Sequence, residues 1–155
     1  PHLLNMATTG IKPSDEIIAQ FNELKLKQTY KFMIITLDQK EKNTWEFVEA
    51  GTEPGCDDSE NEAAWGRLVE KLLANEHQPA YAVFDFCGTT SDGRPVKKLL
   101  FVKWSPDTAP AKKKMIFSSS SDALKNKFQG VMEKALSASD ADELSYAEAS
   151  KVVLG

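Results

Sequence analysis

The stretch from Trp104 to Gly130 constrains the fold more than any other part of the sequence. It runs from the end of an apolar segment, LLFVKW, through a turn with two prolines into a long helical pattern. Pro106 and Pro110 fit a helix only at or before its first turn, where no helical N–H bond is lost. Ser105 or Asp107 can cap the free amides that follow. The sequence therefore predicts a strand, a turn and a long helix, in that order.

The predicted helix begins with three consecutive lysines, Lys112 to Lys114. The positive end of the helix dipole lies at its N-terminus and favours anions, so folding alone would not select cations there. A cationic helix N-terminus therefore indicates a surface kept for an acidic partner.

A helical wheel at about 3.6 residues per turn separates a buried stripe from an exposed face. Met115 falls among basic residues on the exposed face, where it is either an ordinary exposed methionine or a contact anchor. Lys113 falls towards the buried stripe, which would require an irregular first turn. The serines at 118–121 can bond back to helix carbonyls, so we expect a kink there. The buried stripe holds Phe117, Leu124, Phe128 and Val131, with Ile116 and Ala123 at its margin. The exposed face holds Lys112, Met115, Ser119, Asp122 and Asn126, with Lys114 and Lys125 beside it.

This stretch resembles the ADF/cofilin family, small actin-depolymerising proteins built on one ADF-homology domain. The family pattern is a Trp-x-Pro-Asp/Glu-x-Ala-Pro turn, then basic-x-Lys-Met, an aromatic residue, Ser-Ser and Asp-Ala. The resemblance extends to Thr9-Gly10-Ile11, to FNELKL at Phe21 to Leu26 and to YAVFDF at Tyr81 to Phe86. The matching residues of the main stretch are Trp104, Pro106, Asp107, Ala109, Pro110, Lys112, Lys114, Met115, Phe117, Ser119, Ser120, Asp122 and Ala123.

At 155 residues the chain has the size of one domain with a substantial core. We expect Pro1 to Asn5 to be vector-derived residues ahead of an initiator Met6, with a single ADF-homology domain over residues 6–155. A net charge of −4 argues against general nucleic-acid binding. The sequence shows no membrane span and no secretory signal. Cys56 and Cys87 share no motif spacing, which favours reduced thiols over a disulfide.

The order of apolar strands and helices along the chain predicts a mixed β-sheet covered by helices on both faces. The family resemblance implies an α+β fold of the ADF-homology or gelsolin-like type, with a central mixed β-sheet of about five strands sandwiched between helices. The expected elements are a helix capped by Ser14, a central strand Tyr30 to Leu37, a strand around Trp45 and Phe47 paired with it, an acidic loop Gly51 to Glu62, a helix carrying Trp65 to Leu73 and ended by Pro79, strands Tyr81 to Phe86 and Val96 to Trp104 joined by a projecting loop, the long helix, a last parallel strand Val131 to Leu136 taken from the resemblance, and a C-terminal helix Asp140 to Lys151.

An enzyme is not expected. Phosphate-binding loop and dinucleotide-binding motifs are absent, and only His2 and His77 are available for histidine chemistry. The carboxylates at 57, 58, 60 and 62 lie in one loop that reads as solvated rather than as a cation site. We expect no cofactor and no metal. A small α/β enzyme that binds a phosphorylated metabolite at Lys112 remains a remote alternative.

The resemblance implies binding to monomeric and filamentous actin, with severing and depolymerisation driven by tighter binding to a twisted filament. The lysines would attract acidic actin, and Met115 and Ile11 would supply apolar contact. A module that coats filaments without disassembling them, as coactosin-like proteins do, is the alternative. The residues carried over are Thr9, Gly10, Ile11, Lys112, Lys114, Met115, Ser119 and Asp122.

A second surface, specific to filaments, departs from the family pattern. Lys98 and Lys151 match it, with Arg94 and Lys97 close by. Uncharged residues stand at Val96, Ser121, Ser150 and Leu154, where the family often has charges. We therefore expect monomer binding to be kept and filament binding to be weaker or more salt-sensitive.

Regulation carries over in part. Thr9 occupies the place where many family members are phosphorylated, although an unmodified terminus is the alternative. Phosphoinositide head groups are expected to compete for Lys112, Lys113, Lys114 and Lys125. We expect a monomer in the cytoplasm on the actin cytoskeleton. The lysine run could also mimic a nuclear signal, which a folded helix presents poorly.

Overall fold

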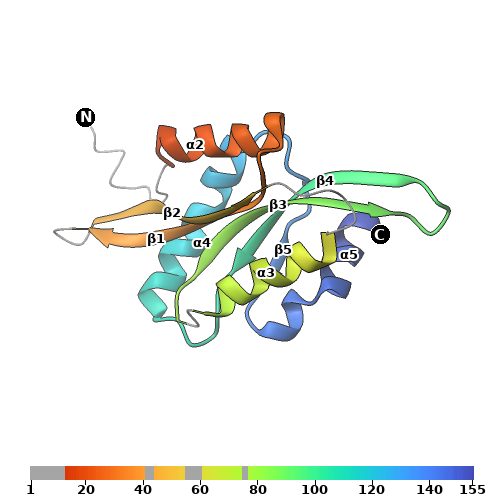
Figure 1. Ribbon diagram of the computed structural model, residues 1–155. Coiled ribbons are helices and arrows are strands. Elements are labelled where there is room, and N and C mark those ends of the chain that lie inside the picture. The colour runs from red at the N-terminus through yellow and green to blue at the C-terminus, as the bar shows by residue number, and fades with distance from the viewer. Residues whose placement is uncertain (1–12, 41–43, 55–60, 75–76) are drawn as a thin grey trace.

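The computed structural model describes residues 13–40, 44–54, 61–74 and 77–155 (Figure 1). Five strands form one sheet in the order β2-β1-β3-β4-β5. Neighbouring strands are antiparallel except for β4 and β5, which are parallel, so the predicted mixed sheet of about five strands is confirmed. The strands are β1 Tyr30–Lys40, β2 Thr44–Pro54, β3 Ala80–Thr89, β4 Pro95–Trp104 and β5 Leu136–Ala138. The helices are α2 Asp15–Asn22, α3 Asn61–Leu73, α4 Ala111–Lys127 and α5 Tyr146–Leu154, with a π-helical turn η1 at Glu23–Lys27 and a 3₁₀ turn η4 at Ala141–Leu144.

The sheet is covered on both faces because side chains alternate along each strand. On one face, β-strand residues such as Phe84 and Val102 pack with Trp65 and Leu68 of α3 and with Ala149 of α5. α3 and α5 therefore lie on the same side of the sheet (Figure 1). On the other face, Val83 and Phe101 pack with Phe21 of α2 and with Phe117 and Leu124 of α4. This second face holds the long helix in place.

The first helix follows the sequence prediction closely. The Ser14 hydroxyl accepts a hydrogen bond of 3.2 Å from the Ile17 N–H, which confirms the predicted cap. Ile17, Phe21 and Leu24 are buried, while Ile18 is half-buried. The helix continues into the π-turn η1 before the chain enters β1.

Three predicted boundaries between β2 and β3 are wrong. β2 continues to Pro54, so the first residues of the predicted acidic loop, 51–54, belong to a strand. Asn61 and Glu62, at the loop's other end, already belong to α3. That helix ends at Leu73, well before Pro79, which instead directly precedes β3. Asp57, Asp58, Glu60 and Cys56 lie outside the described residues.

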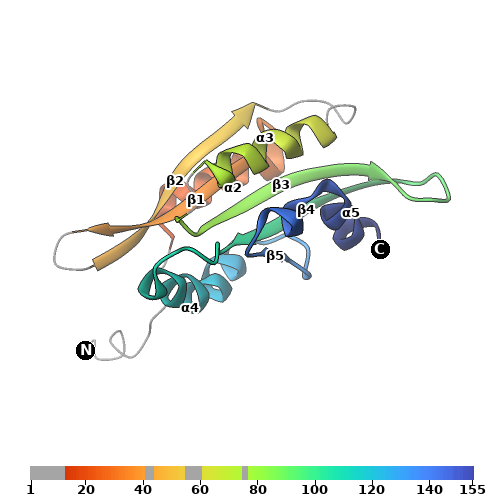
Figure 2. The ribbon, with the colours of Figure 1, turned by 90° about the horizontal axis from the view of Figure 1, so that it is seen from below.

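The hairpin of β3 and β4 projects beyond the rest of the sheet (Figures 1 and 2). β1 pairs with β3 only from Ala80 to Phe84, while β4 pairs with the whole of β3. The outer half of β3 is therefore held by β4 alone among the described strands. Gly93 closes the hairpin with a φ of +88°, a conformation that glycine adopts without strain. The predicted projecting loop is confirmed.

The last strand lies later in the chain than predicted. Val131 makes only an isolated parallel bridge with Leu99, and the strand proper begins at Leu136 opposite Val102. Val131 and Leu136 are five positions apart in the chain, whereas their partners Leu99 and Val102 are three positions apart. The exposed charged residues at 133 and 134 occupy the extra length, so the chain leaves the sheet and then rejoins it.

The predicted C-terminal helix is interrupted. The Asp140 carboxylate accepts from the Glu143 N–H at 3.0 Å and caps the short turn η4. Ser145 then adopts an extended conformation, and its hydroxyl caps α5 by accepting from the Glu148 N–H at 3.2 Å. Two local caps five residues apart therefore produce two short elements instead of one helix.

Candidate functional site

Helix α4 begins at Ala111 directly after Pro110 and has no side-chain cap. The prediction that Ser105 or Asp107 caps it is wrong. Their backbone N–H groups instead donate to the carbonyls of Ala138 (2.9 Å) and Ser139 (3.3 Å). The turn before α4 is therefore joined to β5 and the residue after it, and this attachment sets where the helix starts.

The first turn of α4 contains three lysines and no acidic residue, as predicted. Lys112 is exposed, and Lys113 and Lys114 are half-buried. None of these three side chains forms an ion pair with a carboxylate of the described residues. Because the helix dipole disfavours cations at this end, the positive charge is maintained against a local electrostatic cost.

Lys113 needs no irregular first turn, contrary to the sequence prediction. Its ammonium donates a hydrogen bond of 2.9 Å to the amide oxygen of Gln78. Gln78 in turn donates to the Leu37 carbonyl at 2.9 Å. A half-buried lysine on this side of the helix is therefore compatible with a regular first turn, because its ammonium has a polar partner.

The exposed face of α4 carries Met115 between basic residues. Met115 is 63% exposed, one of three large apolar side chains that are exposed within the described part of the chain. Lys112, Asp122 and Asn126 share its exposure, and Ser119 is half-buried. We call Lys112, Lys114, Met115, Ser119 and Asp122 the α4 face. The predicted separation of this face from the buried Phe117, Leu124 and Phe128 is confirmed.

The serine run of α4 bonds back onto the helix, as predicted. The Ser119 hydroxyl donates to the Ile116 carbonyl at 3.1 Å, and the Ser121 hydroxyl donates to the Ser118 carbonyl at 3.3 Å. Such bonds compete with the backbone ladder and bend helices. The helix nevertheless stays continuous from Ala111 to Lys127, and the kink itself stays a prediction.

Tyr81 of β3 fixes the middle of α4 from below, a role that the sequence did not reveal. Its hydroxyl donates to the Phe117 carbonyl, and its ring stacks on the Phe117 ring at 4.1 Å and on Phe101 at 5.6 Å. Burial, with a smaller contribution from the negative charge of Asp122, raises the pKa of Tyr81 well above its ordinary value. The phenol therefore stays a hydrogen-bond donor to the helix.

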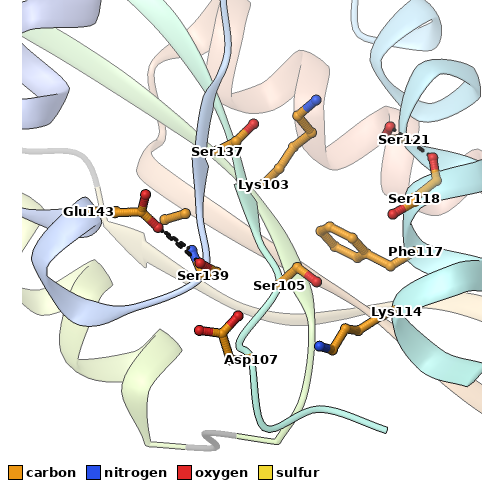
Figure 3. A pocket seen from close by; sticks show the side chains of 11 residues that line it. Lys103, Ser105, Asp107, Lys114, Phe117, Ser118, Ser121, Ser137, Ser139 and Glu143 are labelled. Atoms are coloured by element: carbon orange, nitrogen blue, oxygen red, sulfur yellow. Dashed lines mark hydrogen bonds between the residues drawn. The ribbon is translucent and has the colours of Figure 1, made fainter. Parts of the chain in front are cut away.

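A groove of about 580 Å³ lies beside α4. Lys114 and Asp107 lie on facing sides of it, and Glu143 closes one end by accepting from the N–H (2.8 Å) and hydroxyl (3.0 Å) of Ser139 (Figure 3). These bonds hold the pKa of the Glu143 carboxyl below its usual range. The groove is lined by two amines, two carboxylates and five serines, together with the Phe117 ring and Ala138. Its lining can therefore contact both polar and apolar groups.

The residues predicted for a second surface gather at the other end of the molecule. Arg94 pairs with Asp92 at 3.1 Å near the hairpin tip, Lys97 lies 3.9 Å from Asp85, and Lys98 is exposed. α5 packs against the hairpin. Its residue Leu154 lies so close to Gly88 of β3 that a Cβ atom built on this glycine would be 3.6 Å from the leucine side chain. This brings Lys151, which pairs with Glu148 at 3.1 Å, to the same end. α4 begins on the side of the molecule away from the hairpin tip (Figures 1 and 2).

The four lysines predicted for phosphoinositides do not lie together. Lys125 lies in the last turn of α4, about 20 Å along the helix axis from Lys112 at a rise of about 1.5 Å per residue. Its ammonium donates to the Glu133 carbonyl and so holds the segment that follows the helix. Only Lys112, Lys113 and Lys114 share one end of the helix.

Three of the predicted contact residues, Thr9, Gly10 and Ile11, lie outside the described residues. His77 is exposed in the turn after α3. No group of three or more histidine, cysteine, aspartate or glutamate side chains in the described ranges could hold a metal ion. The helices described here are also too short or too polar to cross a membrane.

Comparison with known proteins identifies the family. Residues 10–153 match the model of the cofilin/tropomyosin-type actin-binding proteins. The chain is 36% identical to actin-depolymerizing factor 3 of Arabidopsis thaliana over 138 residues, covering 89% of this chain and 91% of that protein. It is 32% identical to cofilin of Saccharomyces cerevisiae over 142 residues, covering 91% of this chain and 90% of that protein. The crystal structure of Plasmodium berghei actin depolymerization factor 2 superposes with a TM-score of 0.76 at 24% identity, covering 92% of this chain and 96% of that one.

The chain therefore belongs to the ADF/cofilin family of actin-binding proteins, and its α+β architecture is the ADF/cofilin fold. The resemblance inferred from Trp104 to Ala123 is confirmed across nearly the whole chain.

Proposed function

We propose that this protein binds actin monomers and filaments through the α4 face and promotes filament severing and depolymerisation without covalent chemistry. The observation that carries the proposal is the exposed Met115 beside Lys112 and Lys114, at a helix N-terminus with no acidic residue. Actin is acidic, so the lysines steer the encounter and Met115 supplies desolvated contact. Thr9, Gly10 and Ile11 extend the same surface in this proposal.

Filament disassembly follows from differential binding. A protein that binds the twisted filament more tightly than the relaxed one shifts the filament towards the twisted state. Weakened subunit contacts then lead to severing and monomer release. The second surface, Arg94, Lys97, Lys98 and Lys151, contacts a neighbouring filament subunit. Three of these four side chains already lie beside a carboxylate, namely those of Asp92, Asp85 and Glu148, which supports a weak filament-specific contact.

The test uses fluorescent actin filaments whose lengths are followed with time. We expect the wild-type protein to shorten them and the double variant Lys112→Ala, Lys114→Ala to act more slowly, with affinity reduced by roughly 1 kcal/mol. Lys27→Ala, Lys134→Ala is the matched control, since it removes two exposed lysines outside the α4 face. Equal loss in both double variants would contradict the assignment. Filaments that are coated but keep their length would identify a coactosin-like module instead.

Anionic lipid competes for the same helix end in this proposal. Lys112, Lys113 and Lys114 present positive charge to a phosphoinositide head group, while Lys125 contributes little because it lies in the last turn of α4, about 20 Å along the helix from Lys112. Vesicles containing a phosphoinositide should retain the wild-type protein and release a Lys112→Ala, Lys113→Ala, Lys114→Ala variant. Lys125→Ala should behave as wild type. Unchanged retention of the triple variant would refute the site.

Phosphorylation at Thr9 is proposed as the off-switch because a phosphate adds about −1.5 to −2 charges next to an acidic partner. Thr9→Glu should weaken actin binding, and Thr9→Gln serves as the uncharged control. Equal affinity of the two variants would remove the switch.

We also propose that the protein acts as a monomer on the cytoplasmic actin cytoskeleton, with nuclear entry as a further expectation from the lysine run.

A further inference from the structure

Lys31 and Cys87 form a buried pair that the actin-binding surfaces do not use. The Lys31 side chain is 1% exposed and its ammonium lies 3.5 Å from the Cys87 sulfur. The same ammonium lies 5.3 Å from the centre of the Phe84 ring, a cation–π contact. Cys87 is 3% exposed and forms no disulfide. Two nucleophilic groups, an amine and a thiol, are thus held together inside the protein.

The pair lies where the projecting hairpin leaves the body of the sheet. β1 and β3 stop pairing at Phe32 and Phe84, and Cys87 lies beyond that point, paired with Lys97 of β4. The Asn61 side chain accepts from the Cys87 N–H at 2.8 Å and fixes the backbone there. Strand segments beyond the end of a ladder open locally at a lower free energy than the core. A small oxidant can reach Cys87 during such opening.

The chemistry of the pair favours a reaction between its members. The Lys31 ammonium donates to the Cys87 sulfur, and the thiolate is the form of a cysteine that reacts with a peroxide. Oxidised cysteine, as the sulfenic acid, condenses with a nearby nucleophile, either a thiol or a nitrogen. The side-chain nitrogen of Lys31, 3.5 Å from the Cys87 sulfur, can act as this nucleophile.

We propose that Lys31 and Cys87 form a redox-sensitive modification site, in which a peroxide joins the two side chains through a nitrogen–sulfur bond. The thiolate attacks one oxygen of hydrogen peroxide, the O–O bond breaks, and the leaving hydroxide takes a proton from the ammonium and departs as water. The neutral amine then attacks the sulfenic sulfur, the S–O bond breaks, and the hydroxide leaves as water with the amine proton. Sulfur is oxidised by two electrons and one peroxide is reduced to two waters.

The product is a sulfenamide that ties the start of β1 to the root of the β3–β4 hairpin. A thiol reductant reverses it, because a thiol attacks the sulfur and releases the amine. The site does not depend on the actin assignment, since none of its groups belongs to the α4 face.

The experiment treats folded Cys56→Ser protein with hydrogen peroxide and measures intact mass and tryptic peptides. Removing Cys56 is necessary because a disulfide would cause the same loss of mass. We expect a loss of two hydrogens that a thiol reductant restores, and one peptide pair joining residues 31 and 87, with no cleavage after Lys31. In a Lys31→Arg variant, which keeps the charge, we expect a sulfenic acid at Cys87 that reacts with a dimedone probe.

Several outcomes would overturn the proposal. Addition of oxygen at Cys87 without the joined peptide, absence of any change at Cys87, or the same loss of two hydrogens in Lys31→Arg would each do so. Peptide mapping of the Cys56→Ser protein decides the question even where Lys31→Arg fails to fold.

Discussion

The hydroxyl of Tyr81 donates a hydrogen bond to the backbone carbonyl of Phe117, two residues after the exposed Met115. A buried β-strand residue thereby holds the middle of the helix whose outer face carries the proposed actin contact. The two rings also stack at 4.1 Å, so the helix is fixed both by a polar contact and by an apolar one. The position of the α4 face therefore depends on the sheet beneath it.

Replacing Tyr81 by phenylalanine removes only the hydroxyl. We expect the free energy of unfolding to fall by about 1 kcal/mol, because a buried hydrogen bond is lost while the stacked ring remains. Actin affinity should fall as well, since α4 loses a positional restraint. Denaturation in urea and binding to labelled actin monomers measure the two effects.

Tyr146→Phe is the matched control for this change. The Tyr146 hydroxyl accepts from Asn61 at 2.8 Å on the opposite face of the sheet. Its loss should lower stability to a similar degree without changing actin affinity. If Tyr81→Phe binds actin as tightly as Tyr146→Phe does, Tyr81 supports the fold and does not position α4.

Alkaline pH should destabilise the protein partly through Tyr81. Its pKa is raised in the folded state, so the folded protein keeps a proton that the unfolded chain releases. Below the ordinary tyrosine pKa of about 10, Tyr81 is protonated in both states and does not change the free energy of unfolding with pH. Above that pH, deprotonation of Tyr81 in the unfolded chain lowers the free energy of unfolding. Urea denaturation at a series of alkaline pH values should give a shallower decline for Tyr81→Phe than for the wild type. Parallel declines would show that Tyr81 ionises normally.

Filament binding should be more sensitive to salt than monomer binding. The second surface relies on exposed charges, whose attraction is screened when the Debye length shortens, whereas the α4 face adds apolar contact from Met115. Co-sedimentation with filaments and fluorescence binding to monomers can be compared from low to high ionic strength. Saturable filament binding that resists salt would contradict the proposed weakness of this surface.

Sequence periodicity predicted the elements that depend on local patterns. The Ser14 cap, the apolar stripe through Phe117 and Leu124 and the exposure of Met115 each follow from spacing within one helix. These features are local because a cap or a stripe involves residues only three or four positions apart. The mixed sheet followed from the order of the predicted strands and helices, and the family resemblance implied the same sheet.

Contacts between distant segments could not be predicted in the same way. Lys113 finds Gln78 at a separation of 35 residues, and Tyr81 finds Phe117 at a separation of 36. Neither pairing has a signature in the sequence, because each depends on how β3 and its preceding turn pack under α4. The late start of β5 has the same origin, since an extra length of chain had to leave the sheet before Leu136.

The most direct test of the central claim compares two exposed apolar residues. Met115 of the α4 face is 63% exposed, and Leu26 of η1, at a different site, is 71% exposed. Each is replaced by alanine, and the dissociation constant for labelled actin monomers is measured. We predict that Met115→Ala weakens binding by about 1 kcal/mol or more, roughly fivefold, while Leu26→Ala binds as the wild type does. Unchanged affinity of Met115→Ala would contradict the assignment of the α4 face as the actin-binding surface.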